Sequence, residues 1–192
     1  MFDVANLPTP IHLPEVLGCD FVVIDFGCGM GHHTMKLADE TPSWGILAID
    51  VHTPGICNVV KMIAQENLTN IKVHLGDGLD ILRDRLTPHT INEIHVLFPD
   101  PWPKPRHNKR RVIQPEFLRI AHRLLTDSGV LRIVTDDDSY ADHVRHVLQS
   151  SEVMQEIPSD FVVPETRYHQ RALRLGHTIH AFAATNRALQ ES

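Results

Sequence analysis

The sequence predicts an α/β fold, in which a mainly parallel sheet carries helices on both of its faces. Short apolar runs alternate with longer segments of helical period along the 192 residues of the chain. These runs contain few polar residues, which indicates strands buried on both faces. The length and composition fit one ordinary globular domain, so we expect a single domain over residues 1–192, with residues 1–20 as a short N-terminal extension.

The apolar runs define the expected strands in chain order. They are Phe21 to Phe26, Gly45 to Asp50, Ile71 to Leu75, Ile91 to Phe98, Gly129 to Val134 and a late strand from His177 to Ala184. A helix is expected to open at His32 and His33. The other predicted helices fill the remaining gaps, over Pro54 to Glu66, Gly78 to Leu86, Gln114 to Leu125 and Ser139 to Gln149.

Composition argues against several classes of protein. No apolar run approaches the roughly 18 residues that cross a bilayer, and the N-terminus lacks the basic start of a signal peptide, so we expect a cytoplasmic protein. Cys19, Cys28 and Cys57 form no Cys-x-x-Cys pair, and the His143-x-x-His146 and His177-x-x-His180 pairs have no third ligand. We therefore expect no metal site. The sequence leaves the choice between monomer and homodimer open.

Basic residues gather in two segments although the formal net charge is −6. An uninterrupted cationic run contains Lys104, Arg106, Lys109, Arg110 and Arg111, and a second cluster contains Arg167, Arg171 and Arg174. Such clusters can neutralise phosphates while the remaining surface stays acidic.

A glycine-rich segment, Gly27-x-Gly29-x-Gly31, directly follows the first strand and precedes a helix. Glycines there allow a cofactor to approach bare backbone amides. A dinucleotide fingerprint would place glycine next, but the chain has His32, so the spacing favours S-adenosylmethionine over NAD. The alternative for this segment is a tight strand-to-helix turn.

Carboxylates stand at the ends of neighbouring predicted strands. Asp50 can accept hydrogen bonds from both ribose hydroxyls of a cofactor, Asp77 or a neighbouring carbonyl can meet the adenine amino group, and Asp25 can face the cationic methionine end. The alternative is that Asp50 and Asp77 only cap the helices that follow them.

The fourth strand runs into Phe98-Pro99-Asp100-Pro101-Trp102-Pro103-Lys104, followed by the cationic run. The prolines restrict the backbone around Asp100, and Trp102 offers a flat surface. With this segment the sequence resembles the tRNA (guanine-N7-)-methyltransferase family. The resemblance extends over Asp25 to Gly31, Asp50 to Gly55, Asp77, Thr135-Asp136, Thr166 to Tyr168 and Arg174 to His177.

The resemblance implies a Rossmann-like class I methyltransferase with a seven-stranded sheet. It implies methyl transfer from S-adenosyl-L-methionine, which leaves as S-adenosyl-L-homocysteine, to N7 of a guanine in the variable loop of tRNA. Asp100 takes the catalytic position, and Asp25, Gly27, Gly29, Gly31, Asp50, Asp77 and Asp100 form the cofactor site. Expected substrate-binding residues are Lys104, Arg106, Lys109, Arg110, Asp136, Thr166, Arg167, Tyr168 and His169.

The chemistry agrees with this assignment, because guanine N7 carries a lone pair and needs alignment more than a strong base. Asp100 can accept hydrogen bonds from the guanine edge, and Trp102 or Tyr168 can stack on the flipped base. His169 stands where the family usually has glutamate, and Asp137-Asp138 replaces an aromatic or acidic pair. These departures keep open the alternative of a paralogue that methylates another RNA or a small nitrogen nucleophile. A further alternative is a catalytically silent tRNA-binding module, because a methyltransferase fold can be retained without turnover.

Overall fold

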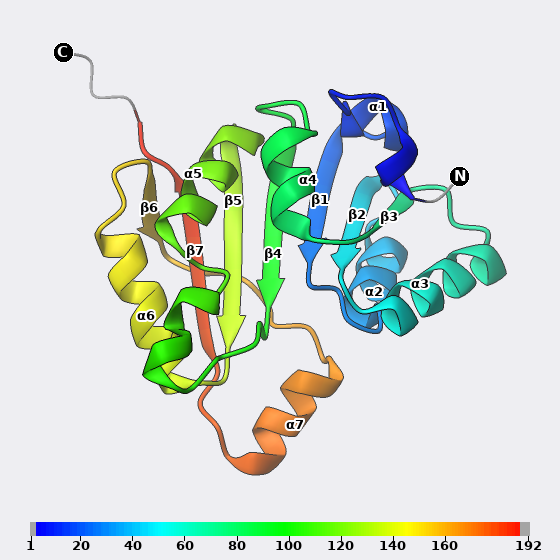
Figure 1. Cartoon of the computed structure of the whole chain (residues 1–192). Helices are drawn as coiled ribbons and strands as arrows, with labels where there is room; N and C mark the ends of the chain where they lie inside the picture. Colours follow the sequence, from blue (N-terminus) through cyan, green and yellow to red (C-terminus); the bar gives the residue numbers. More distant parts are fainter. Residues whose placement is uncertain (1–2, 189–192) are drawn as a thin grey trace.

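The computed structural model describes residues 3–188. Within this range seven strands form one sheet in the order β3-β2-β1-β4-β5-β7-β6 (Figure 1). Neighbouring strands from β3 to β5 pair in parallel, and β7 is antiparallel to both β5 and β6. The predicted mostly parallel α/β fold is confirmed. The strands are β1 Phe21–Phe26, β2 Trp44–Asp50, β3 Ile71–Leu75, β4 Ile91–Leu97, β5 Leu125–Thr135, β6 Met154–Ile157 and β7 His180–Asn186.

Helices pack on both faces of the sheet and bury two separate apolar clusters. One cluster joins the sheet to α1 Leu13–Leu17, α4 Gly78–Asp84, α5 Pro115–Leu124 and α6 Asp138–Gln149. The other joins the opposite face to α2 His32–Glu40 and α3 Thr53–Glu66. The sequence anticipated helices in all of these places except α1. The remaining helical segments are the 3-10 turns η1 Val4–Asn6 and η2 Pro105–Arg110, and the helix α7 Arg167–Leu175.

The strand order reverses between β1 and β4, because the chain moves outward in one direction through β2 and β3 and then returns to start β4 on the other side of β1. In open α/β sheets, ligands bind at the carboxyl ends of the strands that flank such a reversal. Figure 1 shows α7 below this edge of the sheet, where the arrowheads of β1 and β4 point. The fold therefore brings the glycine segment after β1 and the Pro-Asp-Pro-Trp segment after β4 to one place.

The N-terminal extension is part of the packed core over the residues described. Val4, Ile11 and Leu13 are almost fully buried and belong to the same cluster as α4 and α5. Arg85, just after α4, donates hydrogen bonds to the carbonyls of Ala5 and Leu7 at 2.7 and 2.6 Å. Residues 3–20 thus contribute to the apolar layer that also contains α4.

Several element boundaries differ from those that the sequence predicted. Strand β5 begins at Leu125 instead of Gly129, because Leu125 pairs with Ile91 across a bulge and is buried, although polar residues follow it. Strand β7 begins at His180 instead of His177, because Gly176 ends α7 in the left-handed conformation and the His177 amide donates to a carbonyl of that helix. The sequence missed α1, α7 and β6, which are short or mostly exposed.

Candidate active site

The glycine segment forms a tight loop between β1 and α2. Gly27, Gly29 and Gly31 have φ angles of 82°, 55° and 81°, a region that disfavours any side chain. The amides of Gly27 and Cys28 both donate to the carbonyl of Ile49 in β2, so the loop folds back over the end of the neighbouring strand. A Cβ on Gly55 at the start of α3 would lie 2.1 Å from the Gly29 carbonyl oxygen. This contact therefore requires glycine at position 55, and the left-handed φ angle favours glycine at position 29.

The three predicted carboxylates at the strand ends have different local roles. Asp50 holds the loop, because its Oδ2 accepts from the Gly29 amide at 2.7 Å and its Oδ1 accepts from the His52 amide at 2.8 Å. Asp77 is the N-cap of α4 and accepts from the Leu79 amide at 2.9 Å. Asp25 is 2% exposed and accepts from the Thr34 hydroxyl at 2.6 Å.

Asp77 thus caps α4 and also lines the cavity described below, whereas Asp50 caps no helix. Each oxygen of Asp50 accepts one of these backbone hydrogen bonds and retains a further lone pair for a ligand hydroxyl. Nearby, burial raises the pKa of Cys28 well above its ordinary value, so this thiol remains protonated.

A cavity of about 1010 Å³ opens where the strand order reverses. Its size is at the upper end of the range for small-molecule sites. The predicted site residues in its lining are Asp25, Gly27, Gly29, Asp50, Asp77, Asp100, Lys109, Arg110, Thr166, Arg167 and Tyr168. Of the other predicted residues that the structure describes, Gly31, Lys104, Arg106, Asp136 and His169 are not part of the lining. Gly31 is instead the N-cap of α2, and a Cβ there would lie 2.3 Å from Val59 of α3.

The segment after β4 carries backbone strain. Phe98 and Trp102 have φ angles of 52° and 45°, which are rare for bulky residues and occur most often at functional sites. The Phe98 amide donates to the carbonyl of Val134 in β5 at 2.7 Å, which anchors the start of the segment. Asp100 lies between the two strained residues, exposed and in the cavity wall.

Arg111 corrects the prediction that the whole cationic run meets phosphates. Its guanidinium is buried and donates to the carbonyls of Pro101 and Ser139 and to the Ser139 hydroxyl, at 2.8, 3.2 and 2.9 Å. It also lies 5.1 Å from the ring centre of Tyr140, whose pKa burial raises to about 12. Arg111 therefore holds the Asp100 segment against α6 and is not available to nucleic acid.

The exposed basic residues form two sides of the cavity mouth. Lys109 and Arg110 line it from η2, and Arg110 covers Trp102 with its guanidinium carbon 4.8 Å from the ring centre. On α7, Arg167, Arg171 and Arg174 follow a spacing of four and three residues, which places them on one helical face, and all three line the cavity. We call these five residues the cationic rim.

Helix α7 also brings an exposed aromatic ring to the cavity. Tyr168 is 57% exposed, lines the cavity and lies nearly parallel to Phe98, with the ring centres 6.5 Å apart. Thr166 caps the helix by accepting from the His169 amide at 3.1 Å. The His169 ring packs on the Phe98 ring and contacts the Pro164 carbonyl through Nδ1 at 3.2 Å. His169 thus supports Phe98 from outside the cavity lining.

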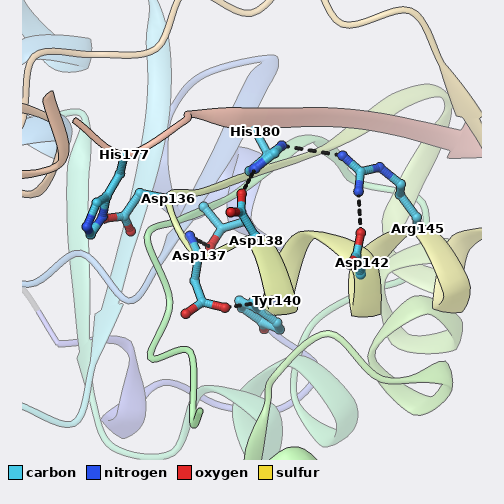
Figure 2. A network of polar contacts seen from close by, with 9 residues as sticks. Asp136, Asp137, Asp138, Tyr140, Asp142, Arg145, His177 and His180 are labelled. Atoms are coloured by element: carbon cyan, nitrogen blue, oxygen red, sulfur yellow. Dashed lines mark hydrogen bonds and ion pairs between the residues drawn. The ribbon is translucent and has the colours of Figure 1, made fainter. Parts of the chain in front are cut away.

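Asp136 belongs to a separate polar network between the β5–α6 turn and the start of β7 (Figure 2). Its Oδ2 lies 2.9 Å from Nδ1 of His177, and Asp138 Oδ1 lies 2.7 Å from Nε2 of His180. Asp137 accepts from the Tyr140 amide and caps α6. Since His177 directly follows the end of α7, the Asp136 contact holds the C-terminal end of the helix that carries part of the cationic rim.

Comparison with known proteins agrees with this geometry. Residues 20–182 match a family model described as a putative methyltransferase. The chain is 37% identical over 185 residues to a tRNA (guanine-N(7)-)-methyltransferase of Nitrosomonas europaea, covering 93% of this chain and 83% of the relative. A relative of the same name from Pasteurella multocida is 35% identical over 178 residues, covering 88% and 70%. The chain belongs to the tRNA (guanine-N7-)-methyltransferase family.

The fold of this family member is shared with solved methyltransferases of distant sequence. A putative methyltransferase from Streptococcus mutans, solved in complex with S-adenosylhomocysteine, superposes with a TM-score of 0.60 at 15% identity, covering 92% of this chain and 94% of that one. The predicted Rossmann-like methyltransferase fold is therefore confirmed. Among residues 3–188, none of the helices has the length and apolar character that a bilayer crossing requires.

Sequence patterns did not single out the apolar residues of the cavity. Val51 is 72% exposed although it is a large aliphatic residue, and it lines the cavity together with Ile49 and Leu79. His33 also lines the cavity, 62 residues from its partner His95, and no sequence pattern indicates that contact.

Proposed function

We propose that this protein transfers a methyl group from S-adenosylmethionine to N7 of a guanine in the variable loop of tRNA. The observation that carries the proposal is one cavity that joins the glycine loop, Asp100 and the cationic rim. The names of the related proteins support the acceptor, since they are tRNA (guanine-N(7)-)-methyltransferases. We further propose that residues 1–192 act as one domain in the cytoplasm, with tRNA as the partner.

The cavity suits an adenosine-containing cofactor along its whole length. Asp50 keeps a free lone pair on each oxygen for the ribose hydroxyls, and Val51, Ile49 and Leu79 offer apolar surface for the adenine. Gly55 lets α3 approach the Gly29 carbonyl closely, because a Cβ at position 55 would clash with it. Asp25 is buried at the end of β1 and supplies negative charge for the methionine end. Bound there, S-adenosylmethionine supplies an electrophilic methyl group.

Asp100 acts at the reacting centre by alignment and charge. Guanine N7 has a lone pair and no proton, so the side chain has no proton to remove before the attack. The ring gains positive charge as the new bond to carbon forms, and the Asp100 carboxylate offsets that charge. The strained backbone at Phe98 and Trp102 fixes the carboxylate at the cavity wall, and Arg111 holds the segment from behind.

The cationic rim and Tyr168 bind the RNA in this proposal. Lys109 and Arg110 on one side and the arginines of α7 on the other neutralise backbone phosphates around the cavity mouth. Tyr168 is the better platform for the flipped guanine, because Arg110 already covers a face of Trp102. Asp136 acts on the RNA indirectly in this proposal, through the His177 contact that holds α7.

The test uses an unmodified tRNA transcript and labelled S-adenosylmethionine. Wild-type protein should incorporate label, and Asp100→Asn should lower the single-turnover rate by about 100- to 1000-fold, as loss of an electrostatic group at a reacting centre does. Asp127→Asn is the matched control, because Asp127 is exposed near the start of β5, at the opposite end of the strand from the cavity. Absence of tRNA labelling by protein that binds S-adenosylhomocysteine would refute the proposed acceptor.

A further inference from the structure

Helix α7 carries the three arginines of the cationic rim that lie on one helical face, yet little of the helix is buried. Of its nine described residues only one is buried. At its N-terminal end the rings of Tyr168 and His169 lie against Phe98, with ring centres 6.5 and 6.1 Å away. At its C-terminal end His177 contacts Asp136, and both side chains are partly exposed, so this pair contributes little to stability. The placement of α7 therefore depends on the chain that leads into it.

Residues 158–165 join β6 to α7 without regular structure, and we call them the strap. Figure 1 shows the strap passing behind the sheet from β6 to α7. The apolar cluster under α2 and α3 has, among the described residues, no member from β4, β5 or β7. Glu93 of β4 pairs in register with Val23 of that cluster, so its side chain points to the same face of the sheet. The strap thus meets a charged area of this face.

Phe161 is the residue of the strap that packs on this area. Its partly buried ring lies edge-on to His95 of β4, with the ring centres 5.1 Å apart, and its centre is 5.1 Å from the guanidinium carbon of Arg132 in β5. Asp160 accepts from Arg132 at 3.0 Å, but its side chain is 89% exposed, and water competes for that contact. The aromatic ring is therefore a stronger attachment of the strap than the ion pair.

Arg132 offers this ring a fixed support. It donates to both carboxylate oxygens of Glu93, at 2.8 and 3.0 Å. Burial raises the pKa of Glu93, but hydrogen bonds from His95 and Arg132 outweigh burial and lower the value to about 2, so the carboxylate is ionised at neutral pH. Two parallel hydrogen bonds to a carboxylate hold the guanidinium plane in one orientation. An aromatic face over such a cation is attracted to one defined place.

Pro164 connects the attached part of the strap to the helix. This residue is buried, and its carbonyl accepts from the amide of Thr166, the N-cap of α7, at 2.8 Å. The same carbonyl lies 3.2 Å from Nδ1 of His169 in the first turn of α7. The end of the strap is thus joined to the first turn of the helix, and a shift of the strap moves that turn.

We propose that Phe161 is a positioning residue for tRNA: seated on Arg132, it fixes the strap and thereby the place of α7 at the cavity mouth. This inference rests on the proposed function, because it takes Tyr168 and the arginines of α7 as groups that bind RNA. Phe161 and Arg132 both lie outside the cavity lining. Phe161 therefore acts on the affinity for tRNA through α7 and leaves the affinity for the cofactor unchanged.

Binding of tRNA and of cofactor, measured separately, tests this assignment. Phe161→Ala should weaken tRNA binding in filter assays by about fivefold or more and reduce the slope of log K against log salt by about 1 to 3, because the arginines of α7 lose phosphate contacts. Calorimetry with S-adenosylhomocysteine should give an affinity within about twofold of the wild-type value.

Two variants in the strap serve as matched controls, and a third protects the test against misfolding. Phe161→Tyr keeps an aromatic ring on Arg132 and should bind tRNA as the wild type does. Val162→Ala changes the neighbouring side chain, which is 88% exposed, and should also leave tRNA binding unchanged. Phe161→Leu keeps apolar bulk without the aromatic face, and it repeats the test should Phe161→Ala fail to fold.

A double-mutant cycle shows whether Phe161 acts through α7. Arg171→Ala should weaken tRNA binding several-fold in the wild-type background but by less than about twofold in Phe161→Ala, because the arginine has already lost its place there. Amides of α7 should also exchange hydrogen faster in RNA-free Phe161→Ala than in the wild type.

Three results would overturn the inference: additive losses in the cycle, unchanged hydrogen exchange over α7, or equal losses of tRNA and S-adenosylhomocysteine binding in a folded variant. Wild-type tRNA affinity in Phe161→Ala would overturn it as well. Wild-type protein that neither binds nor methylates tRNA would instead contradict the proposed function.

Discussion

Replacing Arg111 by alanine should destabilise the protein far more than the same change at Arg110, although the two residues are adjacent in one cationic run. Arg111 is buried and donates three hydrogen bonds, two of them to carbonyl oxygens of Pro101 and Ser139. Arg110 is exposed and lies over Trp102. The pair therefore separates a structural arginine from an RNA-facing one within the same motif.

The size of the effect follows from the groups left behind. Each acceptor that loses its partner away from water costs about 1–3 kcal/mol, and the truncated side chain also leaves a gap beside Tyr140. We expect the free energy of unfolding to fall by about 3–5 kcal/mol in Arg111→Ala. For a chain of this length each kcal/mol lowers Tm by roughly 2–4 °C, so Tm should fall by about 10 °C. Arg110→Ala should stay within about 0.5 kcal/mol.

Thermal and denaturant unfolding followed by circular dichroism measures both variants, and filter binding to tRNA at several salt concentrations completes the comparison. Arg110→Ala should bind tRNA more weakly, with a smaller slope of log K against log salt, because one phosphate contact is lost. An Arg111→Ala protein that melts within about 2 °C of wild type, by the roughly 2–4 °C per kcal/mol scale, would refute the structural role assigned to this residue.

Other variants test separate parts of the molecule. The pKa of Glu93 falls from its ordinary 4.5 to about 2 on folding, so the ionised carboxylate should stabilise the protein above pH 4.5 and lose this effect as the pH falls towards 2. In denaturant unfolding, the free energy of unfolding of Glu93→Gln should therefore depend less on pH than that of the wild type. Gly55→Ala places a Cβ 2.1 Å from the Gly29 carbonyl and should weaken S-adenosylhomocysteine binding about tenfold or more by calorimetry, whereas Cys57→Ala on the same helix should not. Asp136→Asn should loosen the end of α7 and weaken tRNA binding a few-fold, with cofactor affinity unchanged; equal losses of both would contradict this role.

Apolar patterning was enough to predict β1 to β4 and the carboxylates at their ends. Parallel strands buried on both faces have a strong signal, and their carboxyl ends necessarily meet at one edge, so Asp25, Asp50 and Asp77 could be grouped from their positions along the chain. Helix α7 gave no such signal, because Ala172 is its only buried residue among those described and its cavity-facing side is cationic. The local pattern of apolar residues cannot detect a helix that buries almost none of its side chains.

Contacts between residues that are distant along the chain explain the remaining differences between the predicted site and the observed one. Arg111 looks like its neighbours in sequence, and only the packing of the Asp100 segment against α6 shows that it is buried. His33 and His95 are 62 residues apart along the chain, and they meet because the fold brings the start of α2 to β4. Such polar contacts depend on tertiary placement of single atoms, which periodicity does not encode.

Mapping the methylated nucleotide tests the central claim most directly. Unmodified tRNA is incubated with the protein and S-adenosylmethionine, reduced with borohydride and treated with aniline, which cleaves the chain only where N7-methylguanine stands. The cavity, lined by the glycine loop, Asp100 and the cationic rim, predicts a single cleavage at a guanine of the variable loop. Asp100→Asn should reduce this cleavage, and Asp127→Asn should not. Label in the tRNA without cleavage at any guanine would contradict transfer to N7.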